Sequence, residues 1–141
     1  GKIMAMPIPG KPITCAFGVK GPRWSSGMHE GIDVAVPVGT PYYAPIDGTI
    51  VKVGQCWGAA YGQHAVLMKI GSGPLKGKHI VFGHGSSYAV KVGDKVKAGT
   101  LLGKTGAEGN VSGPHLHMEI QDGPGWKKAS GIDPKPVLEA K

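Results

Sequence analysis

The hydrophobic positions of the chain fall in short runs separated by glycine and proline, and they do not repeat with a helical period. No window of about 11 residues free of Gly and Pro has apolar residues at i, i+3, i+4 and i+7, the spacing of an amphipathic helix. Runs rich in β-branched and aromatic residues instead alternate with turn residues, which is typical of strands. The pattern predicts strands at residues 31–36, 48–53, 64–70, 79–82, 95–98, 100–103 and 115–121.

The spacing of these runs predicts an all-β domain, either a compact antiparallel β-sandwich or a barrel. Two segments, 36–50 and 92–102, resemble each other, since each pairs a turn containing valine and glycine with a following strand. Residues 1–12 and 123–141 are rich in Pro, Gly and Lys, and we expect them to wrap the core as irregular arms. We find no linker that would divide the chain, so we expect residues 1–141 to form one domain.

Composition and charge exclude several classes of protein. Of the 141 residues, 40% are hydrophobic, which is too many for a disordered chain, and no apolar run reaches the roughly 18 residues of a membrane-spanning helix. The 16 Lys and Arg outnumber the 9 Asp and Glu, and the resulting net charge of +7 favours polyanions such as nucleic acid, anionic lipid or acidic wall polymers. Because the basic residues are scattered and only 6% of residues are aromatic, we expect no nucleic-acid partner.

The chain contains two cysteines, Cys15 and Cys56, without the Cys-x-x-Cys spacing of a zinc or redox motif. They could form one intrachain disulfide in an oxidising compartment. They could equally be two separate thiols, and the sequence leaves both alternatives open.

Four polar residues are spaced as a metal site requires. His115 and His117 are two residues apart in a predicted strand, so both rings project from the same face. His29 and Asp33 are four residues apart at the start of another predicted strand, again with the same parity. A hydrolytic zinc site needs about three imidazole or carboxylate ligands and leaves a fourth position open for water. The His-Asp pair and one histidine of His-x-His would supply that set and leave one histidine for proton transfer.

Four segments carry a resemblance to a known family. They are 29–33 (His-Glu-Gly-Ile-Asp), 82–84 (Phe-Gly-His), 92–99 (Val-Gly-Asp-Lys-Val-Lys-Ala-Gly) and 105–119, which ends in Pro-His-Leu-His-Met-Glu. With these segments in order over about residues 13–121, the chain resembles the lysostaphin-like zinc endopeptidases of peptidoglycan, also called LytM domains. The resemblance implies a lysostaphin-type all-β fold with a duplicated hybrid motif and a catalytic core at about residues 13–121.

The resemblance also implies the roles of five residues. His29, Asp33 and His117 match the family's zinc ligands, which implies one Zn²⁺ per chain. His115 and His84 match the two catalytic histidines that do not bind the metal. Around His84 the chain departs from the family, because it has Phe-Gly-His-Gly where the family usually has Tyr-Ala-His-Leu.

As a function, the resemblance implies a zinc-dependent metalloendopeptidase that hydrolyses peptide bonds in peptidoglycan stem peptides or cross-links with a zinc-activated water. Peptidoglycan would be the partner, with anionic wall polymers attracted by the positive charge. The implied location is the cell wall, reached by secretion or by delivery from a phage, and we expect a monomer. Residues 6–10 and 131–134 resemble parts of the catalytic modules of phage endolysins.

Other residues are expected to lie outside the catalytic set. We expect Glu30 at the surface, because residues 29–33 lack the second histidine of a helical His-Glu-x-x-His protease. Glu119 is expected to be structural or to support a metal ligand. The sequence assigns no function to His64 or His79. It also assigns none to four residues that could either line a groove or simply pack: Arg23, Trp24, Trp57 and Tyr61.

Two other functions fit parts of the sequence. A family member without catalysis would be a wall-binding or regulatory module, although all five matching residues are present here. Segments 48–50 and 92–96 also resemble biotinyl or lipoyl carrier domains, with Met68-Lys69 as the biotin acceptor. An accepting lysine belongs at an exposed hairpin tip, whereas Lys69 lies within a predicted strand. Zinc content, turnover and intact mass separate the three functions.

Overall fold

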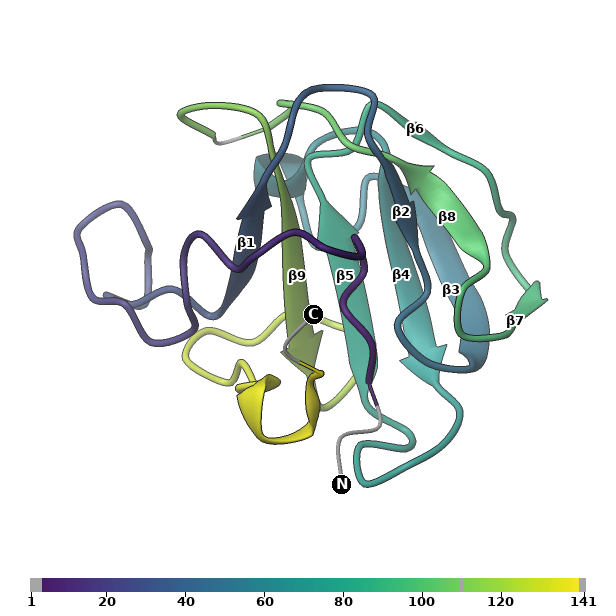
Figure 1. Cartoon of the computed structure of the whole chain (residues 1–141). Coiled ribbons are helices and arrows are strands. Elements are labelled where there is room, and N and C mark those ends of the chain that lie inside the picture. The colour runs from purple at the N-terminus through teal and green to yellow at the C-terminus, as the bar shows by residue number, and fades with distance from the viewer. Residues whose placement is uncertain (1–3, 110, 140–141) are drawn as a thin grey trace.

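The structure is a computed structural model that describes residues 4–109 and 111–139. In this part of the chain it contains strands and two short 3-10 helices, η1 (Ala59–Tyr61) and η2 (Lys135–Val137), and no α-helix (Figure 1). None of the described helices is long enough to cross a membrane. The strands are β1 (Gly31–Ala35), β2 (Pro41–Tyr43), β3 (Gly48–Gly54), β4 (Ala65–Ile70), β5 (His79–Gly83), β6 (Ser87–Tyr88), β7 (Lys95–Val96), β8 (Leu101–Lys104) and β9 (His115–Gln121).

The strands form two antiparallel sheets that pack face to face. The larger sheet has six strands in the order β1-β9-β5-β4-β3-β7, and the smaller has three in the order β2-β8-β6. Figure 1 shows the small sheet lying over β4 and β3, and the ring of Tyr42 in β2 packs against Phe82 in β5 with centroids 5.5 Å apart. The predicted all-β antiparallel architecture is therefore confirmed.

Strand β9 separates the hydrophobic core from a polar face. Its residues Leu116, Met118 and Ile120 are buried in the main core between the sheets, and burial of each such side chain stabilises the fold by roughly 1.5–3 kcal/mol. Because side chains alternate along a strand, His117 and Glu119 project from the opposite face of the same sheet. The core thus holds in place the strand that carries the polar groups.

The register of the large sheet brings distant polar residues together. Asp33 in β1 is paired with His117 in β9, and His117 is paired on its other side with Gly83 in β5. Directly paired residues have Cβ atoms about 4.5–5.5 Å apart, so Asp33 and His117 are neighbours although they are 84 residues apart in sequence. His84 follows β5 at the same end of the sheet.

The described parts of the predicted arms contribute to the core. Met4, Met6 and Ile8 of the first arm and Leu138 of the last are buried in the main cluster, and Met4 pairs with Leu138 in a parallel bridge. Ile120 pairs with Ile132 in an antiparallel bridge. These segments wrap the core as expected, while residues 1–3, 140 and 141 lie outside the described residues.

All seven predicted runs contain strands, but two short strands were not predicted. Strand β2 begins with Pro41 and has three residues, and β6 is the dipeptide Ser87–Tyr88. Both pair with β8, so long-range pairing defines them and local hydrophobic pattern does not. Lys69 lies inside β4, paired with Thr49 and His79, which agrees with the argument against a carrier domain.

Candidate active site

Three predicted ligands meet at one point beside β1 and β9. Nε2 of His29 lies 3.1 Å from Oδ1 of Asp33 and 3.3 Å from Nδ1 of His117, and that Nδ1 lies 2.8 Å from the same carboxylate oxygen. Ligands at about 2.0–2.1 Å from a tetrahedral zinc lie about 3.3 Å from one another. The spacing of two imidazole nitrogens and one carboxylate oxygen therefore fits a zinc ion.

Hydrogen bonds on the far side of each ring turn the ligand nitrogens toward this point. His29 donates from Nδ1 to the carbonyl of Ala16 at 3.0 Å, and His117 donates from Nε2 to Oε1 of Glu119 at 2.9 Å. Since a carbonyl or a carboxylate can only accept, these contacts place the ring proton on the nitrogen away from the cluster. In the neutral ring the other nitrogen has a lone pair that a metal can bind, as in many histidine-ligated zinc sites. A metal there would take the place of the proton through which that nitrogen contacts Asp33.

Glu119 has the supporting role that the sequence allowed. Besides His117, it accepts a hydrogen bond from the Tyr61 hydroxyl at 2.7 Å and one from the Gln121 amide at 2.9 Å. The side chain is almost fully buried, so these donors compensate a carboxylate that has lost its water. One sequence signal could have found Glu119, because it shares the strand face of His115 and His117.

His84 and His115 lie side by side next to the ligand cluster, with ring centroids 4.8 Å apart. His84 donates from Nδ1 to the carbonyl of Glu108 at 2.6 Å, and His115 donates from Nδ1 to the carbonyl of Gly113 at 2.9 Å. Both rings consequently keep an unprotonated Nε2 when they are neutral. The Nε2 of His115 lies 3.6 Å from Oδ2 of Asp33.

A strained turn positions His84 at the end of β5. Its φ of 67° lies in the left-handed region, which is costly for a residue with a side chain and is often tolerated at functional sites. The His84 amide donates to the carbonyl of Tyr61 at 2.8 Å, and the two rings are stacked at 6.3 Å. The departure from the family's usual residues around position 84 therefore does not remove His84 from the site.

Burial and neighbouring charges shift the pKa values of these groups. Burial alone would raise the pKa of Asp33, but hydrogen bonds from His117 and His29 bring it well below its usual range. Burial would lower the pKa of His117, but the carboxylates of Asp33 and Glu119 raise it to about 9. Burial, reinforced by the neighbouring His117, lowers the pKa of His84 to about 4. His84 is therefore neutral at pH 7.

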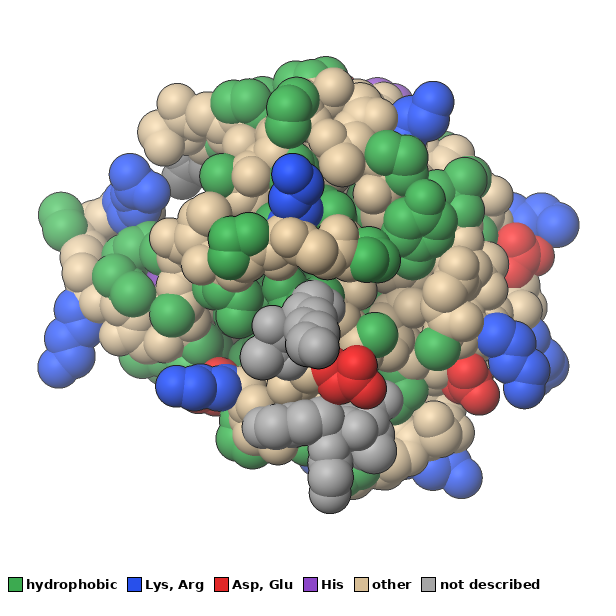
Figure 2. Space-filling view, viewed as in Figure 1, with side chains coloured by type: hydrophobic (Ala, Val, Ile, Leu, Met, Phe, Trp, Pro, Cys, Tyr) green, Lys and Arg blue, Asp and Glu red, His purple; other side chains and the backbone are tan. Residues whose placement is uncertain are grey.

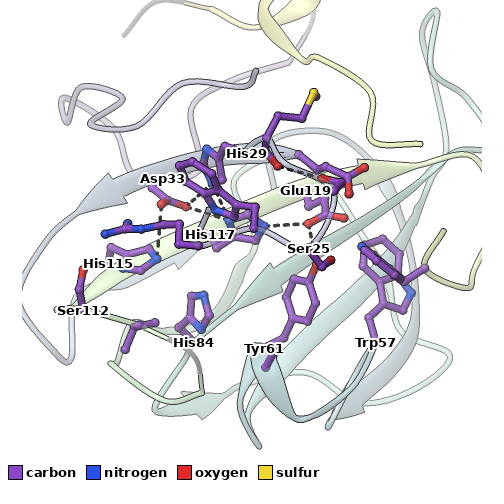
Figure 3. A pocket seen from close by; sticks show the side chains of 18 residues that line it. Ser25, His29, Asp33, Trp57, Tyr61, His84, Ser112, His115, His117 and Glu119 are labelled. Carbon is purple, nitrogen blue, oxygen red and sulfur yellow. Dashed lines mark hydrogen bonds and ion pairs between the residues drawn. The ribbon is translucent and has the colours of Figure 1, made fainter. Parts of the chain in front are cut away.

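The five residues line an open cavity of about 530 Å³ (Figure 3). Aromatic rings form much of its wall: Trp24 packs on His29 with centroids 5.1 Å apart, and Trp57 meets Tyr61 edge-on at 6.1 Å. Arg23 lies over the Trp24 ring. The sequence left open whether these four residues line a groove or only pack in the fold. The structure places all of them in the cavity wall.

The expectation for Glu30 was wrong. Its side chain is buried, and its carboxylate accepts backbone hydrogen bonds from Ala129 at 3.1 Å and Gly131 at 2.8 Å. Glu30 thereby fastens the C-terminal arm beside the ligand His29. His64 and His79 do not line the cavity, as expected.

The cysteines do not form a disulfide in the structure. Cys15 and Cys56 are both free thiols. Cys56 is fully buried in a second hydrophobic cluster with Ala65, Leu67 and Val81, while Cys15 is half-buried and pairs with Asp33 in an antiparallel bridge. Of the two alternatives left open by the sequence, the structure has the separate thiols.

Known proteins are similar to this chain in sequence and in fold. The model of peptidase family M23 matches residues 27–134. The chain is 34% identical over 116 residues to the glycyl-glycine endopeptidase ALE-1 of Staphylococcus capitis, which covers 82% of this chain and 30% of that protein. It is 34% identical over 102 residues to the peptidoglycan DD-endopeptidase ShyA of Vibrio cholerae, which covers 65% of this chain and 20% of that protein.

A solved structure extends the similarity to three dimensions. The crystallised catalytic domain of the antimicrobial peptidase lysostaphin from Staphylococcus simulans aligns with a TM-score of 0.75 at 29% identity, and the alignment covers 92% of both chains. The chain thus matches nearly all of that catalytic domain, whereas it spans less than a third of the length of the two curated relatives.

Proposed function

The chain belongs to peptidase family M23, and from this premise we propose that it is a zinc-dependent metalloendopeptidase that hydrolyses peptide bonds in bacterial peptidoglycan, in stem peptides or in cross-links. One observation carries the proposal: three ligand atoms within 3.3 Å of one another adjoin two histidines that each present an unprotonated Nε2 to the same cavity. Metal-assisted hydrolysis of a peptide bond needs this combination of an open metal site and a proton acceptor.

The proposal extends to organisation and place of action. We propose that residues 1–141 act as one catalytic domain with its core at about residues 13–121, because the alignment with the lysostaphin catalytic domain covers nearly all of both chains. Its place of action would be the cell wall, after secretion or as part of a phage lysin. The net charge of +7 would draw it to anionic wall polymers, and it would act as a monomer.

His29, Asp33 and His117 would hold one zinc ion. These residues would hold zinc as a Lewis acid, which would polarise a peptide carbonyl and lower the pKa of water toward about 7. The chain's own contribution is orientation, because the carbonyl of Ala16 and the carboxylate of Glu119 fix both rings with a lone pair toward the metal position.

His115 and His84 would act on the attacking water and its proton. His115 accepts it at Nε2, and the Asp33 carboxylate 3.6 Å away stabilises the imidazolium that forms. His84 is neutral, and its Nδ1 is already engaged with the carbonyl of Glu108, so its Nε2 would accept a hydrogen bond from the attacking water and orient it. Trp57 and Tyr61 wall the cavity beside them and would limit the access of bulk water.

The test is turnover of purified peptidoglycan by the metal-free chain before and after addition of zinc, with mass spectrometry of the released fragments. Walls with glycine cross-bridges and walls with direct cross-links are both needed, because the relatives include a glycyl-glycine endopeptidase and a DD-endopeptidase. We expect zinc-dependent cleavage of a peptide bond. Zinc and wall binding without cleavage on either wall would instead make the chain a regulatory binding module.

Two variants separate metal binding from proton transfer. His117→Ala removes one of three ligands, so we expect tight zinc binding and activity to be lost together. His115→Ala leaves the ligands in place, so zinc should remain bound while turnover falls by roughly 10²–10⁴-fold, the usual contribution of a general base. Zinc content is measured by elemental analysis beside the wall assay. Near wild-type lysis by His115→Ala would refute the role given to His115.

A further inference from the structure

A sulfur atom lies next to the predicted metal ligands. The thiol of Cys15 and one ligand atom from each of His29 and Asp33 all lie within 4.8 Å of one another. The five residues with predicted roles do not include Cys15. A thiolate, an imidazole and a carboxylate together form a donor set that thiophilic divalent cations accept.

The backbone holds Cys15 in this position. Cys15 forms an antiparallel bridge with Asp33, in which the Asp33 amide donates to the Cys15 carbonyl at 2.9 Å and the Cys15 amide donates to the Asp33 carbonyl at 3.4 Å. Directly paired residues in such a bridge project to the same side. The adjacent Thr14 fastens the segment further, since its hydroxyl donates to the Asp33 carbonyl at 3.2 Å and accepts from the Ala35 amide at 3.0 Å.

The same segment also fixes the imidazole of the set. The residue after Cys15 is Ala16, whose carbonyl accepts the Nδ1 proton of His29. Residues 14–16 therefore contact both His29 and Asp33, so the thiol belongs to the scaffold that orients the two ligands. Its nearness to them is a consequence of paired backbone and not of a free loop conformation.

We propose that Cys15 is an additional ligand for the divalent cation held by His29 and Asp33, and that its sulfur gives this site a preference for thiophilic metals. When the sulfur binds the cation, the thiol proton leaves to solvent, as metal binding by cysteine requires. This inference rests on the metal site of the proposed function and adds a ligand to it.

The sulfur approaches from outside the cavity. His29, Asp33 and His117 line the cavity, whereas Cys15 is not among the described residues that do. With Cys15 as a fourth protein ligand on that side, water and substrate would need a fifth position on the cavity side. The ligand is compatible with hydrolysis where the cation accepts that fifth position, and its effect is on metal choice and retention.

The test uses Co²⁺ as a spectroscopic probe in the metal-free full chain. We expect weak visible ligand-field bands from cobalt in the site, together with an intense sulfur-to-cobalt charge-transfer band in the near ultraviolet. Cys15→Ser should abolish the near-ultraviolet band and keep the visible bands. It should also weaken Cd²⁺ binding by at least about tenfold, the lower end of what loss of a residue that only supports a ligand costs.

Cys56→Ser is the matched control, because the other thiol is fully buried in a separate cluster, and it should keep the near-ultraviolet band. Visible bands without a sulfur band in the unmodified chain would overturn the Cys15 ligand alone. Absence of all cobalt bands would overturn the metal site of the proposed function as well.

A second measurement needs no variant. Iodoacetamide labelling of the unmodified chain, mapped by mass spectrometry, should show that Cd²⁺ slows alkylation of Cys15, because the thiolate that would attack iodoacetamide is then bound to the metal. Equal alkylation of Cys15 with and without metal would overturn the proposal.

Discussion

Each of the four histidines in the site has one ring nitrogen engaged by a fixed acceptor. For His29, His84 and His115 the acceptor is a backbone carbonyl, and for His117 it is the carboxylate of Glu119. In the neutral form of each ring, this acceptor fixes which nitrogen carries the proton and which has the free lone pair. Orientation of this kind lowers the reorganisation that ligand binding and proton transfer would otherwise require.

Glu119 allows a direct test of this orientation. Glu119→Gln removes the negative charge that accepts the Nε2 proton of His117 and keeps the size of the side chain. We expect zinc affinity to fall by about 10- to 100-fold, as is usual for loss of a residue that supports a metal ligand, with activity restored by excess zinc. The measurement is a competition titration against a zinc chelator.

Tyr61→Phe provides the control for this substitution. It removes only the hydroxyl that donates to Glu119 and leaves the contact between Glu119 and His117 intact. Zinc affinity should therefore fall less than in Glu119→Gln. If Glu119→Gln binds zinc as tightly as the unmodified chain, the carboxylate does not orient His117.

At the scale of elements, the site depends on how closely β1 approaches β9. Gly31 begins β1 opposite Glu119, and a Cβ at Gly31 would lie 2.5 Å from the carbonyl oxygen of Met118 and 2.8 Å from Cε1 of His117. The absence of a side chain at Gly31 therefore lets the two strands pair while the His117 ring occupies the space above them.

Gly31→Ala should consequently damage both strand pairing and the metal site. The added methyl group must displace the β9 backbone or the His117 ring, which costs about 1–3 kcal/mol in overpacking and turns the ring away from its ligand position. We expect a lower free energy of unfolding in urea and weaker zinc binding.

Gly123→Ala is a suitable reference for this variant, because a Cβ at Gly123 meets nothing within 4 Å. It should leave stability and zinc binding unchanged. If Gly31→Ala behaves like Gly123→Ala in both measurements, the close approach of β1 and β9 is not needed for the site.

At the scale of the whole molecule, positive charge is spread over the face that Figure 2 draws. Figure 2 shows Lys and Arg side chains distributed around one face without a single basic patch. A net charge of +7 spread in this way attracts a polyanion without selecting one orientation. Under the proposed function, the charge would act in the encounter with the wall and the cavity in the chemistry.

This division predicts a salt effect that depends on the substrate. Lysis of intact walls should slow markedly as salt rises above about 0.1 M, where the Debye length falls below about 10 Å, whereas hydrolysis of a small uncharged cross-link peptide should not. Initial rates on both substrates across a salt series test this. Equal salt dependence of the two rates would show that charge does not bring the enzyme to the wall.

Seven of the nine described strands could be predicted from the sequence, because each follows a local pattern. The strand spacing singled out four of the proposed site residues, and the family resemblance added His84. The alternation in 115–121 predicted which side chains share a face, and β9 carries them as expected. Strands β2 and β6 were not predicted, because each is short and exists only through pairing with β8. The burial of Glu30 was missed for the same reason, since its partners Ala129 and Gly131 are about a hundred residues away.

The sequence by itself determined the β architecture, because turn residues and strand alternation are properties of neighbouring positions. It also supplied the proposed ligand types and their spacing, because donor chemistry and parity along a strand are local as well. Only the tertiary structure decided which acceptor orients each ring, how Tyr61 reaches Glu119 and where the Cys15 sulfur lies. These contacts join segments that are distant along the chain. Their geometry comes from sheet register and packing around one core, and no local pattern contains that information.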